Sequence, residues 1–191
     1  MSANHAAFNL IFRFVENYVS PIAGRISSQR HVMAIRDGFI SAMPFMIVGS
    51  FLLVFAYPPF SPDTTWGFAR AWLDMAKQFE GQILTPFDMT MGVMSLYICA
   101  AIAYNLGKHY VKTHQLDPFM CAMLSLMAFL LVAAPKTKGA LPVDSLGGTG
   151  IFTAILVAIY CVEMMRFLKA HNIGIRLPDQ VPPMIKNSFD L

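Results

Sequence analysis

The sequence has few charged residues for its length. Charged side chains make up 13% of the 191 residues, hydrophobic ones make up 56%, and the formal net charge is only +3. An ordinary soluble domain carries about 25% charged residues. The shortage excludes a typical water-soluble globular protein and favours a membrane as the solvent of this chain.

Charge is absent altogether from four long stretches. They are residues 38–62, 89–107, 118–135 and 145–162. Each is close to the length of about 17 to 25 residues that a helix needs to cross the hydrocarbon core. Because ionisable groups inside a membrane usually belong to ion pathways, their absence excludes a proton relay or an ion-coupled pump built from these stretches.

Cysteine is scarce, and no pattern joins the cysteines that are present. Cys99, Cys121 and Cys161 each lie in a different charge-free stretch, where a thiol behaves as a small packing residue. Their spacing matches neither a disulfide framework nor a zinc site. The sequence therefore predicts no metal at these positions.

Catalytic constellations are also missing. We interpret the stretch Lys108–Gln115, with His109 and His114, as a solvated basic loop, because no cysteine or carboxylate cluster completes a metal site there. Gly147–Gly150 lacks the lysine of a phosphate-binding loop. The other histidines have no partner in the sequence: His5, His31 and His171. We predict no catalytic residue and no cofactor.

The long apolar stretches predict an all-α membrane protein with about four transmembrane helices. The expected spans cover about residues 35–57, 89–106, 117–134 and 148–167. Tyr57 and the two prolines after it are expected to end the first span. Acidic residues at the span ends are explained by helix starts or by snorkelling to the surface: Asp37, Asp88, Asp117, Asp144 and Glu163.

Small residues recur every four positions in two of the spans. The second span has Ser95, Cys99, Ala103 and Gly107, and the fourth has Gly150, Ala154 and Ala158. Such stripes let the backbone of a neighbouring helix approach closely. We predict that these seven residues pack helices together.

Two further segments are expected to be helical without crossing the membrane. Residues 8–22 place apolar side chains at helical spacing, which predicts an amphipathic helix on the cytoplasmic membrane surface. Residues 66–84 combine an aromatic stripe with a charged face, which we interpret as an interfacial helix on the outer side.

The distribution of lysine and arginine predicts the orientation. Ten of the 14 lie in the N-terminal segment up to Arg36, in the stretch Lys108–Gln115, or in the tail that begins at Arg166. The positive-inside rule then places both termini in the cytoplasm. We therefore predict three parts: a cytoplasmic N-terminal segment at residues 1–34, a membrane domain at residues 35–168 and a cytoplasmic tail at residues 169–191. Anionic membrane lipid explains the positive charge without any nucleic acid.

Three stretches together resemble one known family. They are RHVMAIRDGFISAMP at Arg30–Pro44, TMGVMSL at Thr90–Leu96 and LPDQVPPMIKNSF at Leu177–Phe189. In order and spacing they resemble enzyme IIC, the sugar permease of bacterial phosphotransferase systems, in its cellobiose, lactose and chitobiose branch. The first resembles the start of the first membrane helix, the second a later helix start, and the third the segment before the next span.

The resemblance implies a function in sugar uptake across the bacterial cytoplasmic (inner) membrane. Members of the family are more than twice as long, and this chain resembles their N-terminal half, which supplies the scaffold and most of the homodimer contact. The family carries a disaccharide inward, and the cytoplasmic IIA and IIB proteins deliver the phosphoryl group. The histidine and glutamate associated with sugar binding belong to the other half, so no substrate-binding residue is assigned here.

Other functions stay open. This chain, which we expect to be inactive by itself, resembles part of a permease that is truncated or completed by a second polypeptide. A free-standing membrane scaffold, a regulatory partner of a complete permease or a remnant of a decayed permease gene would show the same small-residue stripes. A membrane enzyme would need a polar constellation in or beside the spans.

Overall fold

The computed structural model describes residues 13, 15–134, 143–171 and 173. In chain order the elements are η1 (Val15–Val19), α2 (Ser20–Ser27), α3 (Arg30–Ala56), α4 (Gly67–Thr90), α5 (Met94–His114), α6 (Pro118–Ala133), η2 (Gly148–Gly150) and α7 (Ile151–Ala170). Every element in the described ranges is helical, which confirms the all-α prediction.

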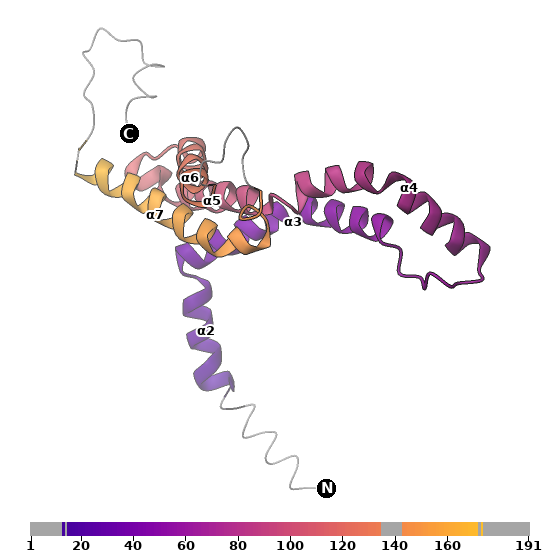
Figure 1. Ribbon diagram of the computed structural model, residues 1–191. Helices are drawn as coiled ribbons and strands as arrows, with labels where there is room; N and C mark the ends of the chain where they lie inside the picture. The colour runs from indigo at the N-terminus through magenta and orange to yellow at the C-terminus, as the bar shows by residue number, and fades with distance from the viewer. Residues whose placement is uncertain (1–12, 14, 135–142, 172, 174–191) are drawn as a thin grey trace, which may run out of the picture.

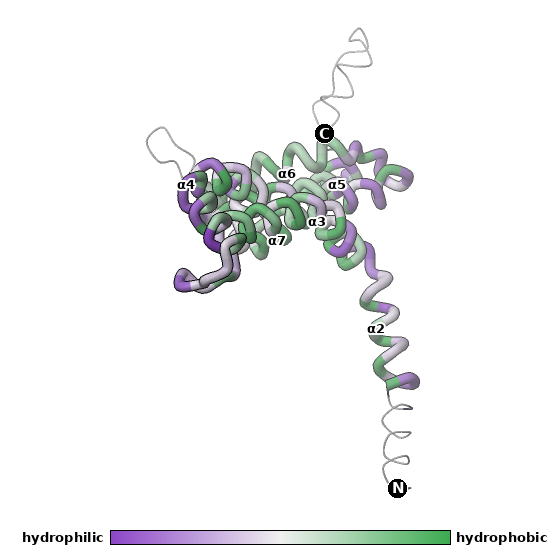
Figure 2. The backbone as a smooth tube through the Cα atoms, turned by 90° about the vertical axis from the view of Figure 1, so that its right-hand side faces the viewer, coloured by the Kyte–Doolittle hydropathy of each residue, from purple (hydrophilic) through white to green (hydrophobic). Residues whose placement is uncertain are grey.

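The helices form a bundle with two extensions (Figure 1). α5 contacts α3, α6 and α7, and therefore lies at the centre of the bundle. The second half of α3 leaves the bundle and runs beside α4, and we call this pair, residues 46–90, the hairpin arm. α2 projects from the other end of α3 and is more hydrophilic than the bundle helices (Figure 2).

The core of the bundle gathers around α5. Ile98, Ile102 and Leu106 of α5 are fully buried, together with Phe129 of α6 and Val162 of α7. Lipid tails are as apolar as these side chains, so burial alone contributes little to helix association in a membrane. Close packing between helices must therefore contribute most of the stability.

Within the residues that the structure describes, three segments are long and apolar enough to cross a membrane. They are Arg30–Ala56, Gly67–His114, which joins α4 to α5, and Gly148–Ala170. α6 has only 16 residues. At about 1.5 Å per residue it is shorter than a hydrocarbon core of about 30 Å. The apolar helical character expected of a membrane protein is confirmed, whereas the number of four spans stays a prediction.

The interpretation of Lys108–Gln115 as a loop is wrong. α5 begins at Met94 and continues through this stretch to His114, and Gln115 ends it with a left-handed φ of 54°. Charged residues end the apolar run but not the helix. Lys112 and His114 lie in its last turn, where positive charge interacts favourably with the helix dipole.

The segment expected to be a separate outer helix, residues 66–84, belongs to the longer helix α4. Ala69 and Ala76 are buried in α4, which packs along α3. The Trp72 indole donates a hydrogen bond to the Phe55 carbonyl oxygen at 3.2 Å. That α4 lies at the outer interface stays a prediction.

The acidic residues at the expected span ends differ in their roles. Asp117 caps α6, because its carboxylate accepts a hydrogen bond from the Phe119 amide at 2.8 Å, and this confirms a helix start. Asp37 and Asp88 lie inside α3 and α4, so for them a helix start is wrong. Asp144 lies in a turn shortly before η2.

Parts of two predictions lie outside the described residues: residues 8–12 and 14 of the amphipathic segment, and the motif at 177–189. The described part of the amphipathic segment is helical in η1 and α2. Tyr18, Ile22 and Ile26 are exposed there. Their contact with a membrane surface stays a prediction.

Candidate functional site

The seven small residues predicted to pack helices are all buried. Ser95, Cys99, Ala103 and Gly107 lie on α5, Gly150 ends η2, and Ala154 and Ala158 lie on α7. The structure therefore places them where helices meet. That they drive helix association stays a prediction.

Gly107 shows why the stripe on α5 needs small residues. A Cβ atom at this position would lie 3.0 Å from the Pro118 Cα and 3.1 Å from the Cys121 Sγ. The backbones of α5 and α6 therefore approach each other as closely as a glycine permits.

A third stripe, on α3, was missed by the sequence analysis. Ala34, Gly38 and Ala42 are buried at the same spacing of four. A Cβ on Gly38 would lie 2.9 Å from the Ile102 amide nitrogen, so α3 approaches the backbone of α5 directly. The spacing in the sequence is the signal that would have identified this stripe.

Ser95 and Gly150 come together although they belong to different predicted stripes. A Cβ on Gly150 would lie 2.9 Å from the Ser95 Oγ. The Ser95 hydroxyl also donates to the Leu146 carbonyl oxygen, and the Ser95 amide donates to the same oxygen at 3.0 Å. These hydrogen bonds attach the start of α5 to the segment that leads into α7.

A polar cluster lies at the end of the bundle where α3 begins and α5 and α7 end. Its centre is Glu163, whose side chain is 24% exposed. The Glu163 Oε1 lies 2.9 Å from the His31 Nε2 and accepts a hydrogen bond from the Tyr110 hydroxyl. The Glu163 Oε2 lies 2.7 Å from the Arg166 Nη2. One carboxylate thus joins three helices.

Cationic and aromatic groups surround Tyr110 in the same cluster. The Arg30 and Arg166 guanidinium carbons lie 5.4 Å and 5.2 Å from the centre of its ring, within range of cation–π attraction. The His114 ring approaches edge-on, with the two ring centres 5.6 Å apart. The cluster has more basic groups than its one carboxylate neutralises.

This cluster corrects two interpretations. His31 does not stand alone, because it contacts Glu163, and Glu163 is held by partners on three helices rather than only extending towards a surface. No local pattern would have paired them, since His31 and Glu163 are 132 positions apart.

His109 and His114 lie on α5, and the described ranges contain no group of three potential metal ligands.

Two open cavities lie elsewhere. One, of about 250 Å³, is on the hairpin arm and includes Tyr57, Lys77 and Glu80 in its lining. The other, of about 410 Å³, lies beside the turn between α4 and α5, with Asp88 and Asp144 in its lining. Neither lining includes a histidine, cysteine or serine.

Comparisons with known proteins converge on one family. Residues 36–191 match the family described as Phosphotransferase system, EIIC. The PTS system cellobiose-specific EIIC component of Geobacillus stearothermophilus is 35% identical over 93% of this chain and 40% of its own length. The lichenan permease IIC component of Bacillus subtilis is 34% identical over 95% of this chain and 41% of its own length.

A solved structure agrees. The transporter ChbC, the IIC component from the N,N'-diacetylchitobiose-specific phosphotransferase system, is similar with a TM-score of 0.76 and 34% identity. The similarity covers 93% of this chain and 42% of that one. The chain therefore spans about two fifths of the length of these relatives.

Proposed function

The chain belongs to the EIIC family of the phosphotransferase system, and we propose that it forms the N-terminal portion of a permease for a β-linked disaccharide. In this proposal the sugar is phosphorylated as it enters the cell, and cytoplasmic IIA and IIB proteins deliver the phosphoryl group. The names of relatives, which refer to cellobiose, lactose and diacetylchitobiose, support the substrate class. The match over residues 36–191 carries the proposal.

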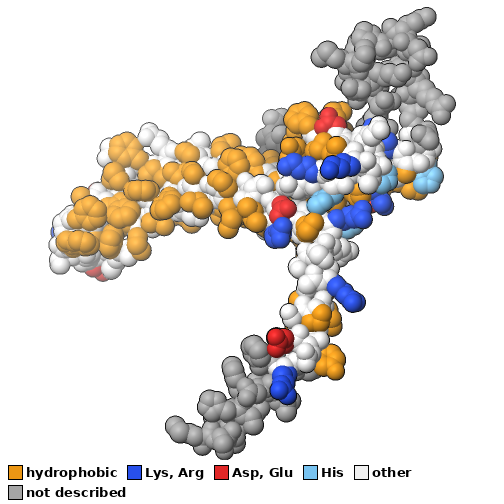
Figure 3. Space-filling model, turned by 180° about the vertical axis from the view of Figure 1, so that it is seen from behind, with side chains coloured by type: hydrophobic (Ala, Val, Ile, Leu, Met, Phe, Trp, Pro, Cys, Tyr) orange, Lys and Arg blue, Asp and Glu red, His pale blue; other side chains and the backbone are white. Residues whose placement is uncertain are grey.

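Within such a permease, this portion acts as a scaffold and as a contact for a second copy. α3, α6 and α7 enclose α5 through buried small residues, which suits a rigid support. Large apolar side chains cover the visible face of the hairpin arm (Figure 3). The exposed large hydrophobic residues of the arm include Ile47, Phe51, Val54, Phe68 and Phe79. Lipid or the helices of a homodimer partner would cover such a surface.

The proposed orientation in the bacterial inner membrane places both termini in the cytoplasm. Arg30 lies at the start of α3, while Lys112 and Lys169 lie near the ends of α5 and α7. Cations at these three helix ends support a cytoplasmic location of that end of the bundle. A reporter enzyme that is active only outside the cytoplasm, fused after Ala170, should be silent.

Complementation in two pieces tests the function. Cells without their own disaccharide permeases would express this chain alone, or together with the remaining part of the Geobacillus relative from a second plasmid. The expected result is uptake and phosphorylation of cellobiose only when both pieces are present. The complete relative serves as the positive control, and the second piece alone as the negative control.

Each outcome has a distinct meaning. Activity of both pieces together supports a permease portion whose sugar contacts lie in the other piece. Activity of the 191 residues alone contradicts the prediction that they hold no complete sugar site. Silence in both, with the chain present in the membrane, favours a free-standing scaffold, a regulatory partner or a remnant of a permease gene.

A further inference from the structure

The end of the bundle that contains the polar cluster has cations without matching carboxylates. The two oxygens of Glu163 are already occupied by His31, Tyr110 and Arg166. The Glu163 carboxylate therefore has little capacity left to pair with a further cation. Additional cations at this end need another source of negative charge.

The other nearby carboxylates are also engaged. Asp37 pairs with Arg36 at 2.8 Å, and Asp117 caps α6. Four cations form no ion pair with any carboxylate in the described part of the chain, and all four are exposed: Arg30, Lys108 and Lys112 at this end of the bundle, and Arg25 on α2, which joins it. We call these four residues the basic end.

Arg30 is the best positioned member of the basic end. Its guanidinium carbon lies over the Tyr110 ring, 5.4 Å from the ring centre, and Tyr110 is itself 1% exposed and hydrogen-bonded to Glu163. A buried aromatic ring thus fixes the position of an exposed cation. A planar guanidinium held in this way suits the paired oxygens of a phosphate group.

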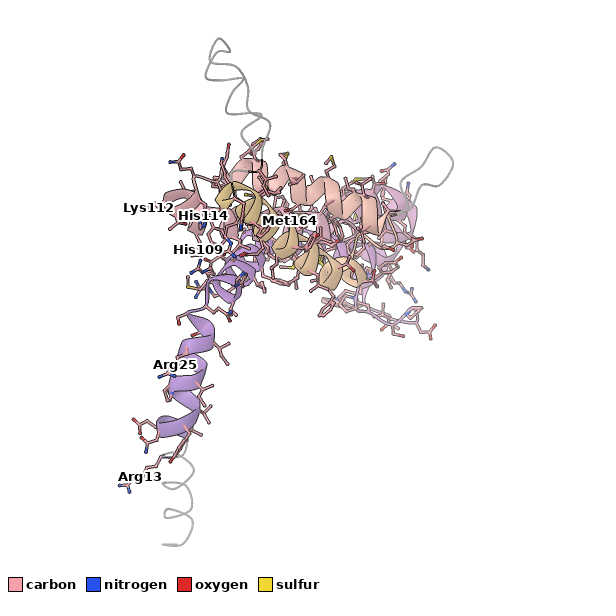
Figure 4. The ribbon with its side chains drawn as sticks, turned by 90° about the vertical axis from the view of Figure 1, so that its left-hand side faces the viewer. Arg13, Arg25, His109, Lys112, His114 and Met164 are labelled. Carbon is pink, nitrogen blue, oxygen red and sulfur yellow. The ribbon has the colours of Figure 1, made fainter. Side chains whose placement is uncertain are left out.

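Exposed apolar side chains lie on the same helices as the basic end or on the neighbouring helix α7. Ile26 is 55% exposed on α2, Val111 is 41% exposed on α5, and Phe167 is 51% exposed on α7. Figure 3 shows Lys, Arg and His side chains gathered on the bundle where α2 joins it, with hydrophobic side chains beside them. Figure 4 shows His109, Lys112 and His114 at this end of the bundle, and Arg25 on α2, which projects away from it.

We propose that the basic end binds the phosphate group of an anionic membrane lipid, with Arg30 as the main contact. The exposed apolar side chains on these helices favour a lipid over a soluble anion, because acyl chains would cover them while the headgroup meets the cations. Lys112 contributes further positive charge. The inference depends on insertion of the chain into a membrane and not on transport.

Native mass spectrometry of the complete chain tests this site. The protein would be equilibrated in detergent with equal amounts of phosphatidylglycerol and phosphatidylcholine, and the two bound lipids would be counted. We expect a preference for phosphatidylglycerol, which Arg30→Gln reduces about fivefold. Lys112→Gln should reduce it less, and high salt should reduce it further.

Arg70→Gln is the matched control, because Arg70 lies on the hairpin arm and its Nε donates to the Thr64 carbonyl oxygen at 2.8 Å. It should leave the lipid preference unchanged. Circular dichroism checks that each variant is folded, and Arg30→Lys should restore part of the preference.

Three results would overturn the proposal. The first is equal retention of the two lipids by the unmodified chain. The second is an unchanged preference in both Arg30→Gln and Lys112→Gln. The third is displacement of phosphatidylglycerol by millimolar inorganic phosphate, which would indicate a site for a free anion. The uptake experiment tests the permease function separately from the lipid measurement. A failure of one proposal can therefore be distinguished from a failure of the other.

Discussion

Two glycines inside long helices, Gly38 in the bundle and Gly81 in the hairpin arm, have opposite surroundings. In the bundle, a Cβ on Gly38 would lie 2.9 Å from a backbone nitrogen of α5, whereas a Cβ on Gly81 in the arm would meet nothing within 4 Å. Both glycines lie inside long helices. The comparison teaches that a small residue contributes to packing only where another backbone is present to approach it.

The arm has buried small residues of its own, Gly49 on α3 and Ala69 and Ala76 on α4, and in addition aromatic and polar contacts. Phe60 contacts Trp72 with ring centres 5.7 Å apart, and the Tyr57 hydroxyl donates to the Glu80 carboxylate at 3.0 Å. Because these contacts are largely exposed, we expect substitutions in the arm to cost less stability than substitutions in the bundle.

The largest expected effect is that of Gly38→Leu. The added side chain would push α3 away from Ile102, which we expect to destabilise the bundle by about 3 kcal/mol. Thermal unfolding in detergent measures the loss. Gly81→Leu is the matched control and should be neutral or slightly stabilising, since leucine favours a helix more than glycine. Equal losses in both variants would contradict the comparison.

Gly107→Leu should cost about 2 kcal/mol, because the Pro118 and Cys121 atoms around it leave no room for a side chain. The same unfolding measurement applies, together with the oligomer size in detergent. Gly24→Leu on α2, where nothing lies within 4 Å, is the control. Unchanged stability and oligomer size would show that the stripe on α5 does not pack helices.

Glu163→Gln tests the polar cluster and should destabilise the protein by about 1.5 kcal/mol, since His31 and Arg166 lose their shared carboxylate. Asp88→Asn is the control, because the exposed Asp88 forms no ion pair in the described ranges. His31→Ala should then cost less in the Glu163→Gln variant than in the unmodified chain. Additive losses would disprove coupling between the two residues.

Ser95→Ala has the smallest expected effect, a loss of about 1 kcal/mol. The Leu146 carbonyl oxygen keeps its hydrogen bond from the residue 95 amide, so only the hydroxyl contact disappears. Ser50→Ala is the control in the arm, because the exposed Ser50 hydroxyl bonds only within α3, to the Met46 carbonyl oxygen. Equal unfolding temperatures for the two variants would remove the role assigned to Ser95.

Much of the fold follows from local pattern. The apolar runs predict α3, α6 and α7 to within a few residues, because a run of that length without charge is most stable as a helix in lipid. The boundary between α4 and α5 is less predictable. α4 continues to Thr90 through Pro86 and past Asp88, so neither residue ends the helix. Contact with α3 outweighs these local preferences.

The residues of the candidate site also differ in whether the local sequence pattern predicts them. The seven small residues are recognisable from a spacing of four, because that spacing places them on one helix face. The stripe on α3 has the same signal. Glu163, His31 and Tyr110 have none, since their partners come from helices far apart in the chain.

The sequence by itself determined the class of solvent, the positions of the apolar helices and the family to which the chain belongs. These properties depend on composition and on short-range order, which are present in the chain before it folds. Only the tertiary structure decided that α5 is enclosed by three helices, that Glu163 joins α3, α5 and α7, and that Arg30 lies over Tyr110. Such contacts depend on how whole helices pack, and many different packings are compatible with the same local pattern.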